Sequence, residues 1–126
     1  MDVRSIVDVE PEVEHNGTVP VWYLVHPRAM KQITDGGFLE LINEFEVAAG
    51  GAVFPHEHPT HEWYFVMSGR GVMIVGDEER AVGPGDLVYI PPDVVHSLRP
   101  TGGGAIHCFC FAVGVKGAGE IDYTSH

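Results

Sequence analysis

The sequence predicts an all-β domain, a sandwich or barrel, and three observations lead to this. Short apolar or alternating runs recur along most of the chain, and turns rich in glycine and proline separate them. No segment carries the apolar spacing of a convincing helix. Many short strands joined by such turns are typical of two packed sheets. At 126 residues the chain has room for one such domain with its own core.

The expected elements follow one another from an N-terminal arm. Residues 1–20 contain Pro11 and Pro20 and are expected to form an extended arm, which leaves 21–126 as the barrel domain. Residues 26–37 are expected to be a connection that ends in a glycine turn. The alternation of apolar and polar residues places strands at 21–25, 38–47, 52–58, 62–67, 71–75, 79–82, 86–90, 94–98 and 104–113.

Alternation within residues 38–47 indicates which face of this strand is buried. Leu41 and Phe45 share one face with other apolar residues, whereas Glu40 and Glu44 fall on the opposite face. Asn43 lies on the apolar face, and a buried amide must find hydrogen-bond partners. Two interpretations stay open: Asn43 contacts substrate or water in a pocket, or it makes a structural hydrogen bond to the backbone.

Charge and composition argue against several classes of partner. A formal net charge of −11 disfavours a nucleic-acid backbone and an anionic membrane surface. No apolar run is long enough to span a membrane, and the acidic start does not resemble a signal peptide. The two cysteines, Cys108 and Cys110, suggest buried thiols in a reducing, cytoplasmic compartment rather than a disulfide framework.

The most informative segment holds three histidines and a glutamate. His56, His58, His61 and Glu62 fall within seven residues, and His96 follows in a later turn-rich stretch. Imidazole and carboxylate together suit Fe, Mn, Ni, Zn or Cu. Residues two apart on a strand share a face, so the rings of His56 and His58 can converge on one ion. Glu62 opens the next apolar run and can approach from a neighbouring strand.

The spacing of residues 50–69 resembles the first signature motif of the cupin superfamily. That motif reads G-x5-H-x-H-x3-4-E-x6-G, and the chain matches every fixed position with Gly50, His56, His58, Glu62 and Gly69. The resemblance covers roughly residues 38 to 113. It implies a small, single-domain jelly-roll β-barrel of the cupin type, in agreement with the strand pattern.

Residues 85–100 resemble the second cupin motif, G-x5-P-x-G-x2-H-x3-N. Gly85, Pro91 and His96 match it, whereas Asp93 replaces the glycine and Pro100 replaces the asparagine. Neither replaced position is a ligand. Aspartate tolerates the left-handed backbone region better than most residues, so we expect the turn at Asp93 to form.

By this resemblance, His56, His58, Glu62 and His96 are the ligands of one divalent transition metal per chain, which can be Fe, Mn, Ni, Zn or Cu. Four protein ligands on a six-coordinate ion leave two positions, where water, substrate or dioxygen could bind. The alternative is a barrel whose polar groups are hydrogen-bonded without a metal. Because the ligand set is complete, we favour the metal.

Alternation then extends the site to neighbouring side chains. Phe54 shares a face with His56, Tyr64 with Glu62, and Leu98 with His96, so these three residues and Asn43 are expected to line a substrate pocket. Tyr64 would serve either as a polar group in the pocket or as bulk in the core.

Other histidines are expected to have lesser roles. His61 should face away from Glu62, toward the surface or a position behind the ligands. His107 shares a face with Phe109. It could act as an acid or base, but we expect it to be a hydrogen-bonded core histidine. His15 and His26 fall in segments that are expected to be mobile.

Three functions are consistent with these residues. The first is a metal-dependent enzyme of dioxygenase, isomerase or lyase type that acts on a small molecule. The second is a non-catalytic barrel that binds or senses a small molecule such as a sugar or small acid, and the third is a purely structural barrel. The complete ligand set favours the first and disfavours the third.

The outward residues Trp63, Phe65 and Met67 suggest a partner subunit. They lie opposite Glu62 and Tyr64 and are apolar, so both faces of this strand need cover. Single-domain cupins are commonly homodimers, and the resemblance therefore implies a homodimer. Neither nucleic acid nor a membrane is an expected partner.

Overall fold

The computed structural model describes residues 2, 4–33, 38–115 and 124–125, and it confirms an all-β fold. A 3-10 turn at Ile6–Asp8 and a short helix α1 (Pro27–Ile33) accompany the strands. The strands are β1 (Glu12–Glu14), β2 (Val19–Val25), β3 (Leu39–Val47), β4 (Val53–Glu57), β5 (Thr60–Ser68), β6 (Gly71–Val75), β7 (Glu78–Val82), β8 (Leu87–Ile90), β9 (His96–Pro100), β10 (Ile106–Gly114) and β11 (Thr124–Ser125).

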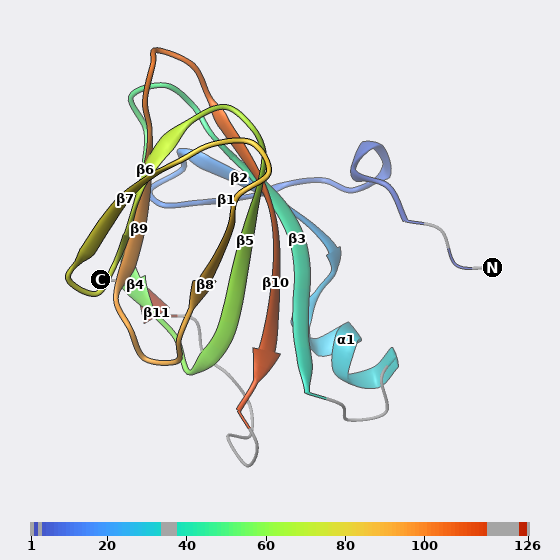
Figure 1. Ribbon diagram of the computed structural model, residues 1–126. Helices are drawn as coiled ribbons and strands as arrows, with labels where there is room; N and C mark the ends of the chain where they lie inside the picture. The colour runs from blue at the N-terminus through green and yellow to red at the C-terminus, as the bar shows by residue number, and fades with distance from the viewer. Residues whose placement is uncertain (1, 3, 34–37, 116–123, 126) are drawn as a thin grey trace.

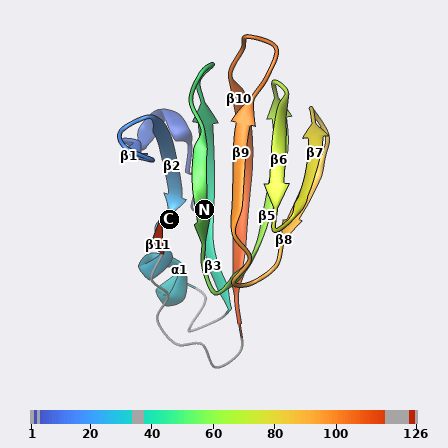
Figure 2. The same cartoon turned by 90° about the vertical axis from the view of Figure 1, so that its left-hand side faces the viewer.

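Two antiparallel sheets face each other and enclose the core (Figure 1). One sheet has the order β1-β2-β3-β10-β5-β8, and the other has the order β11-β4-β9-β6-β7. Figure 2 looks onto the second sheet, where β4, β9, β6 and β7 lie side by side. From β3 to β10 the chain crosses repeatedly between the sheets, which is the jelly-roll arrangement expected from the strand pattern and the motifs.

Every strand expected from the sequence is present, and its bounds agree within two residues. The burial of β3 also follows the expected alternation, because Leu41, Asn43, Phe45 and Val47 all turn into the core. The paired strand β10 alternates in the same way along its whole length. The core between the sheets consists mainly of Val19, Val21, Leu41, Phe45, Val47, Val53, Tyr64, Val66, Met73, Val82, Ile90, Leu98, Ile106, Cys108, Cys110 and Ala112.

The expectation that the chain contains no helix is wrong for α1. Pro27 occupies the first helical position, where a missing N–H costs nothing. The helix buries only Met30 within its seven residues, so it carries too short an apolar stripe to be seen in the sequence.

The helix also explains a buried charge on β3. Glu40 was expected on the solvent face of this strand, yet it is 3% exposed. Lys31 on α1 forms an ion pair with it, with Nζ 2.7 Å from Oε1. At Glu40 the outer face of β3 is therefore covered by a helix that supplies the opposite charge, and not by water.

The N-terminal segment contributes a strand to the barrel. β1 lies within residues 1–20 and pairs with β2, with Glu14 opposite Val19. The turn between them is held by a hydrogen bond from the N–H of Thr18 to the carbonyl of Glu14, at 3.1 Å. This hairpin brings residues 14 and 15 close to β4, which matters for the site described below.

No helix in the described parts of the chain is long and apolar enough to cross a membrane.

Candidate metal centre

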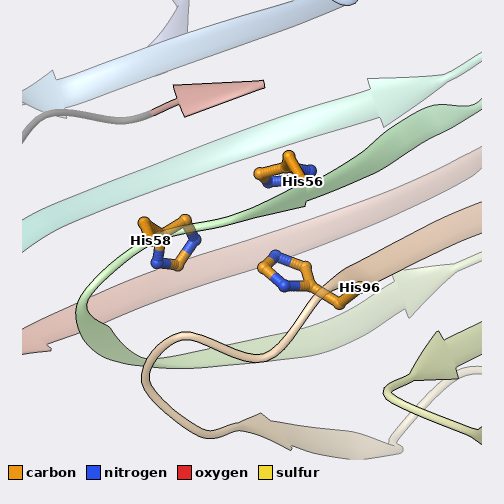
Figure 3. A group of neighbouring side chains, drawn as sticks. All are labelled: His56, His58 and His96. Carbon is orange, nitrogen blue, oxygen red and sulfur yellow. The ribbon is translucent and has the colours of Figure 1, made fainter. Parts of the chain in front are cut away.

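Three histidines from two neighbouring strands and a turn converge on one point (Figure 3). His56 on β4 and His96 on β9 are directly opposite in the register of their strands, and His58 follows at the end of β4. One ligand nitrogen from each ring lies within 4.8 Å of the others. Two nitrogens bound to one ion at its usual bond length lie at most about 4.2 Å apart, so a small movement of the rings completes the site.

Two of these rings are held in the form that a metal requires. The Nδ1–H of His56 donates to the carbonyl of Phe54 at 2.7 Å, and the Nδ1–H of His96 donates to the carbonyl of Val94 at 2.9 Å. A carbonyl only accepts, so the proton of each neutral ring is on Nδ1 and Nε2 keeps its lone pair.

The Nε2 atom of His96 provides an independent indication of a metal site. The side chain is buried, and this nitrogen has no hydrogen-bond partner among the described residues. Buried polar atoms without a partner are rare in proteins. A divalent cation coordinated by Nε2 would satisfy it, so the residues present fit a metal.

Glu62 on β5 lies next to the three rings. Its Oε1 is 2.9 Å from Nε2 of His58 and 3.4 Å from Nε2 of His96. Burial by itself would raise the pKa of this carboxyl group, but the hydrogen bond from His58 and the proximity of His96 outweigh it and bring the pKa to about 2. Glu62 is therefore a carboxylate at neutral pH and is placed to act as the fourth ligand.

The proton of the neutral His58 ring can be on Nδ1 instead of Nε2, which allows Nε2 to bind an ion. Its Nδ1 is hydrogen-bonded to the hydroxyl of Thr60 at 2.6 Å. A hydroxyl can donate or accept, so the proton of His58 can reside on Nδ1 and leave Nε2 free to coordinate. Thr60 would then be the outer partner that orients this ligand.

The turn at Asp93 forms as expected. Asp93 has a φ of 60°, which is the left-handed region, and its N–H donates to the carbonyl of His58 at 2.9 Å. The aspartate thus adopts a left-handed backbone conformation of the kind that glycine adopts most readily. It also ties the loop before β9 to the turn that carries His58.

A single row of paired residues crosses the larger sheet beside the ligands. Tyr23, Asn43, Cys110 and Tyr64 are successive partners on β2, β3, β10 and β5. All four line a cavity of about 80 Å³, together with Glu14, His15, Val19, Val21, Leu41, Phe45, Val53, His56, His58 and Glu62. This is smaller than typical drug-binding pockets, so the cavity suits an ion and a small molecule.

The row clarifies two of the sequence expectations. Oδ1 of Asn43 is buried and has no hydrogen-bond partner in the described part of the chain, which favours a contact in the cavity over a structural one. Tyr64 is buried and packs edge-on against Phe45 with ring centroids 4.9 Å apart. It is therefore both core bulk and a wall of the cavity.

Phe54 and Leu98 do not line this cavity, although alternation had placed both in the pocket. The register between β4 and β9 shifts between Val53 and His56, and this bulge turns Val53 rather than Phe54 inward. Leu98 is buried in the core, farther along β9. A bulge reverses the alternation locally, and the spacing of residues does not reveal it.

Cys110 contacts the carboxylate of Glu62 from the side away from the rings. Its thiol donates to Oε2 at 3.4 Å, whereas Oε1 faces the histidines. Burial, followed by the charge of Glu62, raises the pKa of this thiol well above its ordinary value. Cys110 therefore stays a donor and helps to orient Glu62. Both cysteines are free and buried, as expected.

Sequence reasoning missed Glu14, His15 and Tyr23, which line the cavity from the β1–β2 hairpin. His15, which was expected in a mobile segment, makes a specific contact, because its Nδ1 accepts a hydrogen bond from the N–H of Phe54 at 2.9 Å. The dipeptide Asn16–Gly17 is a strong hairpin signal and could have revealed the turn.

His61 and His107 do not line the cavity. His61 faces outward as expected, hydrogen-bonded to the hydroxyl of Tyr89 at 2.6 Å. His107 is half-buried on the outer face of the larger sheet, with Nε2 2.8 Å from Oε1 of Glu44. A wider hollow of about 550 Å³ between β6, β7 and β8 is lined by none of the ligand residues.

The buried state of His56 predicts a pH dependence of the metal-free protein. Burial, and then the neighbouring His96, lowers the pKa of His56 from 6.5 to about 4. As pH falls from 6.5 to 4.5, the unfolded chain binds a proton that the folded protein does not. The free energy of unfolding should therefore fall, by up to about 1.4 kcal/mol per pH unit from this group. Urea unfolding at several pH values would measure the slope.

The variant His56→Gln is the control for this pH dependence. It should show a shallower slope over the same interval because the titrating group is gone. Equal slopes for the two proteins would show that His56 is not the responsible group.

Comparison with known proteins agrees with this geometry. The family model of the cupin domain matches residues 43–112. An uncharacterized protein of Methanocaldococcus jannaschii is 29% identical over 103 residues, which cover 81% of this chain and 78% of that protein. Quercetin 2,3-dioxygenase of Bacillus subtilis is 31% identical over 72 residues, but these cover only 56% of this chain and 21% of the dioxygenase.

The fold also matches solved structures. A predicted oxalate decarboxylase of Thermotoga maritima superposes with a TM-score of 0.79 at 21% identity. The match covers 90% of this chain and all of that one. At this identity the likeness concerns the fold alone.

Proposed function

Since the chain belongs to the cupin domain family, we propose that it is a metal-dependent enzyme that acts on a small molecule, with a reaction of dioxygenase, isomerase or lyase type. The observation that carries the proposal is the convergence of His56, His58 and His96 beside the ionised Glu62, where the buried Nε2 of His96 has no hydrogen-bond partner among the described residues. A divalent transition metal bound there would supply Lewis acidity or a binding position for dioxygen.

The surrounding residues prepare this site for a small, oxygen-bearing molecule. Three neutral imidazoles and one carboxylate leave a divalent ion with a net positive charge, which favours a substrate oxygen. The walls formed by Val21, Phe45 and Val53 are apolar and limit the water in the cavity. Tyr64 and Asn43 also line the cavity, where the hydroxyl of Tyr64 and the amide of Asn43 would orient the bound molecule.

We also propose that the protein is a homodimer that uses the outer face of β5 and β8. Phe65, Met67, Leu87 and Tyr89 are exposed there. Trp63 stacks on Phe111 beside them, with ring centroids 5.0 Å apart. An exposed apolar face of this kind suits a subunit interface.

Native mass spectrometry of the untagged protein, combined with elemental analysis, tests both proposals. We expect about one equivalent of Fe, Mn, Ni, Zn or Cu per chain, and the mass of a dimer. A chain that contains no metal, and takes up none on reconstitution, would contradict the metal-dependent function. Metal-loaded protein that binds small acids or sugars but never converts them would instead support a binding or sensing role.

A further inference from the structure

His15 lines the metal cavity but is held in a form that cannot bind the metal. Its Nδ1 accepts the N–H of Phe54 at 2.9 Å. A ring nitrogen that accepts a hydrogen bond carries no proton, so the proton of the neutral ring is on Nε2. That atom is a hydrogen-bond donor and has no lone pair for an ion.

The neighbouring His56 has the opposite arrangement, and the same residue sets both. The carbonyl of Phe54 accepts a hydrogen bond from the Nδ1–H of His56, whereas the N–H of Phe54 donates one to Nδ1 of His15. The centroids of the two rings are 5.2 Å apart. The backbone of one residue therefore makes one ring a metal ligand and the other a hydrogen-bond donor.

The position of His15 is maintained by several contacts. His15 and Asn16 have φ values of 52° and 59°, which non-glycine residues seldom adopt. The hydroxyl of Thr18 donates to the carbonyl of His15 at 2.6 Å, and the ring of His15 packs edge-on against Phe54. Such backbone strain persists where the surroundings hold it, and it is concentrated at functional sites.

The same cavity also contains a hydrogen-bond acceptor. Glu14 precedes His15 and lines the same cavity, and its Oε2 accepts the hydroxyl proton of Tyr23 at 2.9 Å. The residue is exposed as a whole, but its carboxyl group is turned toward the cavity wall. The donor and the acceptor together can recognise a hydroxyl group, which accepts one hydrogen bond and donates another.

We propose that His15 and Glu14 recognise a second oxygen of the substrate, so that the site selects a small molecule with a hydroxyl group next to the oxygen that faces the metal, such as an α-hydroxy acid. His15 would donate to this hydroxyl through Nε2–H, and Glu14 would accept its proton in a hydrogen bond. This inference rests on the proposed metal-dependent function.

The tautomers can be measured directly in 15N-labelled, zinc-loaded protein by long-range 1H–15N correlation of the imidazole rings. We expect His15 to be protonated on Nε2 alone, and His56 and His96 on Nδ1 alone. A His15 ring that is protonated on Nδ1 would overturn the inference, even if zinc is bound. Zinc that fails to bind the wild-type protein would instead contradict the proposed function.

Calorimetry with glycolate and acetate tests recognition of the hydroxyl group. In zinc-loaded protein, His15→Phe should keep one equivalent of zinc and bind glycolate roughly tenfold more weakly, because a hydrogen bond to the ligand is lost. The affinity for acetate should not change. His15→Gln retains a donor and should recover part of the loss, and His107→Phe, on the outer face of the same sheet, should behave as wild type.

Three results would overturn this assignment. Loss of zinc in His15→Phe would show that His15 is a metal ligand. Unchanged glycolate affinity would show that His15 does not recognise the hydroxyl group. Failure of glycolate to bind the zinc-loaded wild-type protein would exclude the substrate class. If His15→Phe does not fold, Glu14→Gln, at an exposed residue, replaces it and should also weaken glycolate binding relative to acetate.

Discussion

His58→Ala is expected to abolish stoichiometric metal binding while the barrel remains folded. The substitution removes one of three convergent nitrogens and leaves the Glu62 carboxylate facing a gap. Loss of an outer partner of a metal ligand typically weakens affinity 10- to 100-fold, so loss of a ligand should weaken it by more than about 100-fold. Elemental analysis and competition with a chelator of known affinity would measure the change.

The matched control for this experiment is His61→Ala. His61 lies three positions further along the same segment, but it faces outward and is hydrogen-bonded to Tyr89. This variant should keep a full equivalent of metal. Full occupancy in His58→Ala would show that the ligand assignment is wrong, whereas loss in both variants would indicate damage to the turn between β4 and β5.

Gly69→Ala is expected to destabilise the protein by at least about 3 kcal/mol, which is at the upper end of single substitutions. Gly69 has a φ of 82°, and an added Cβ would overlap the carbonyl oxygen of Ala105 and lie 2.8 Å from Cα of Ile106. Both obstacles are backbone atoms, so no side-chain movement can relieve the contact. Chemical denaturation monitored by tryptophan fluorescence would measure the loss.

Gly102→Ala separates the clash from the backbone strain. Gly102 has a similar φ of 73°, but nothing lies within 4 Å of the added Cβ. This variant should show only the cost of a left-handed alanine, about 1–2 kcal/mol. If the two variants lose equal stability, the close approach at Gly69 is not the reason for its glycine.

Much of the fold could be predicted because the residues within each segment determine its secondary structure. Alternation and turn residues give the position of each major strand, and the motif spacing gives His56, His58, Glu62 and His96. For the candidate ligands His56, His58 and Glu62, the geometry depends on one strand period and one turn, so a short segment of sequence contains it, whereas His96 was identified through the second motif. The helix α1 and the strand β1 were missed because each is short and buries little.

The rest of the cavity could not be predicted because it depends on pairing between distant strands. Tyr23, Asn43, Cys110 and Tyr64 meet only through the register of four strands, and local alternation says nothing about which residues become partners. The error at Phe54 has a related cause, because the bulge in β4 is visible only once β9 is beside it.

The direct pairing of His56 with His96 also bears on how this protein folds. The two residues are far apart in the chain, and β5 to β8 lie between them. The complete ligand set therefore exists only after this long loop has closed, which makes its assembly a late step. Before that step, the unfolded chain presents His56, His58 and His61 together as a local chelator. An ion captured early would thus be bound partly by His61, which faces outward in the folded protein and must release it. Excess metal should therefore slow folding to the native state.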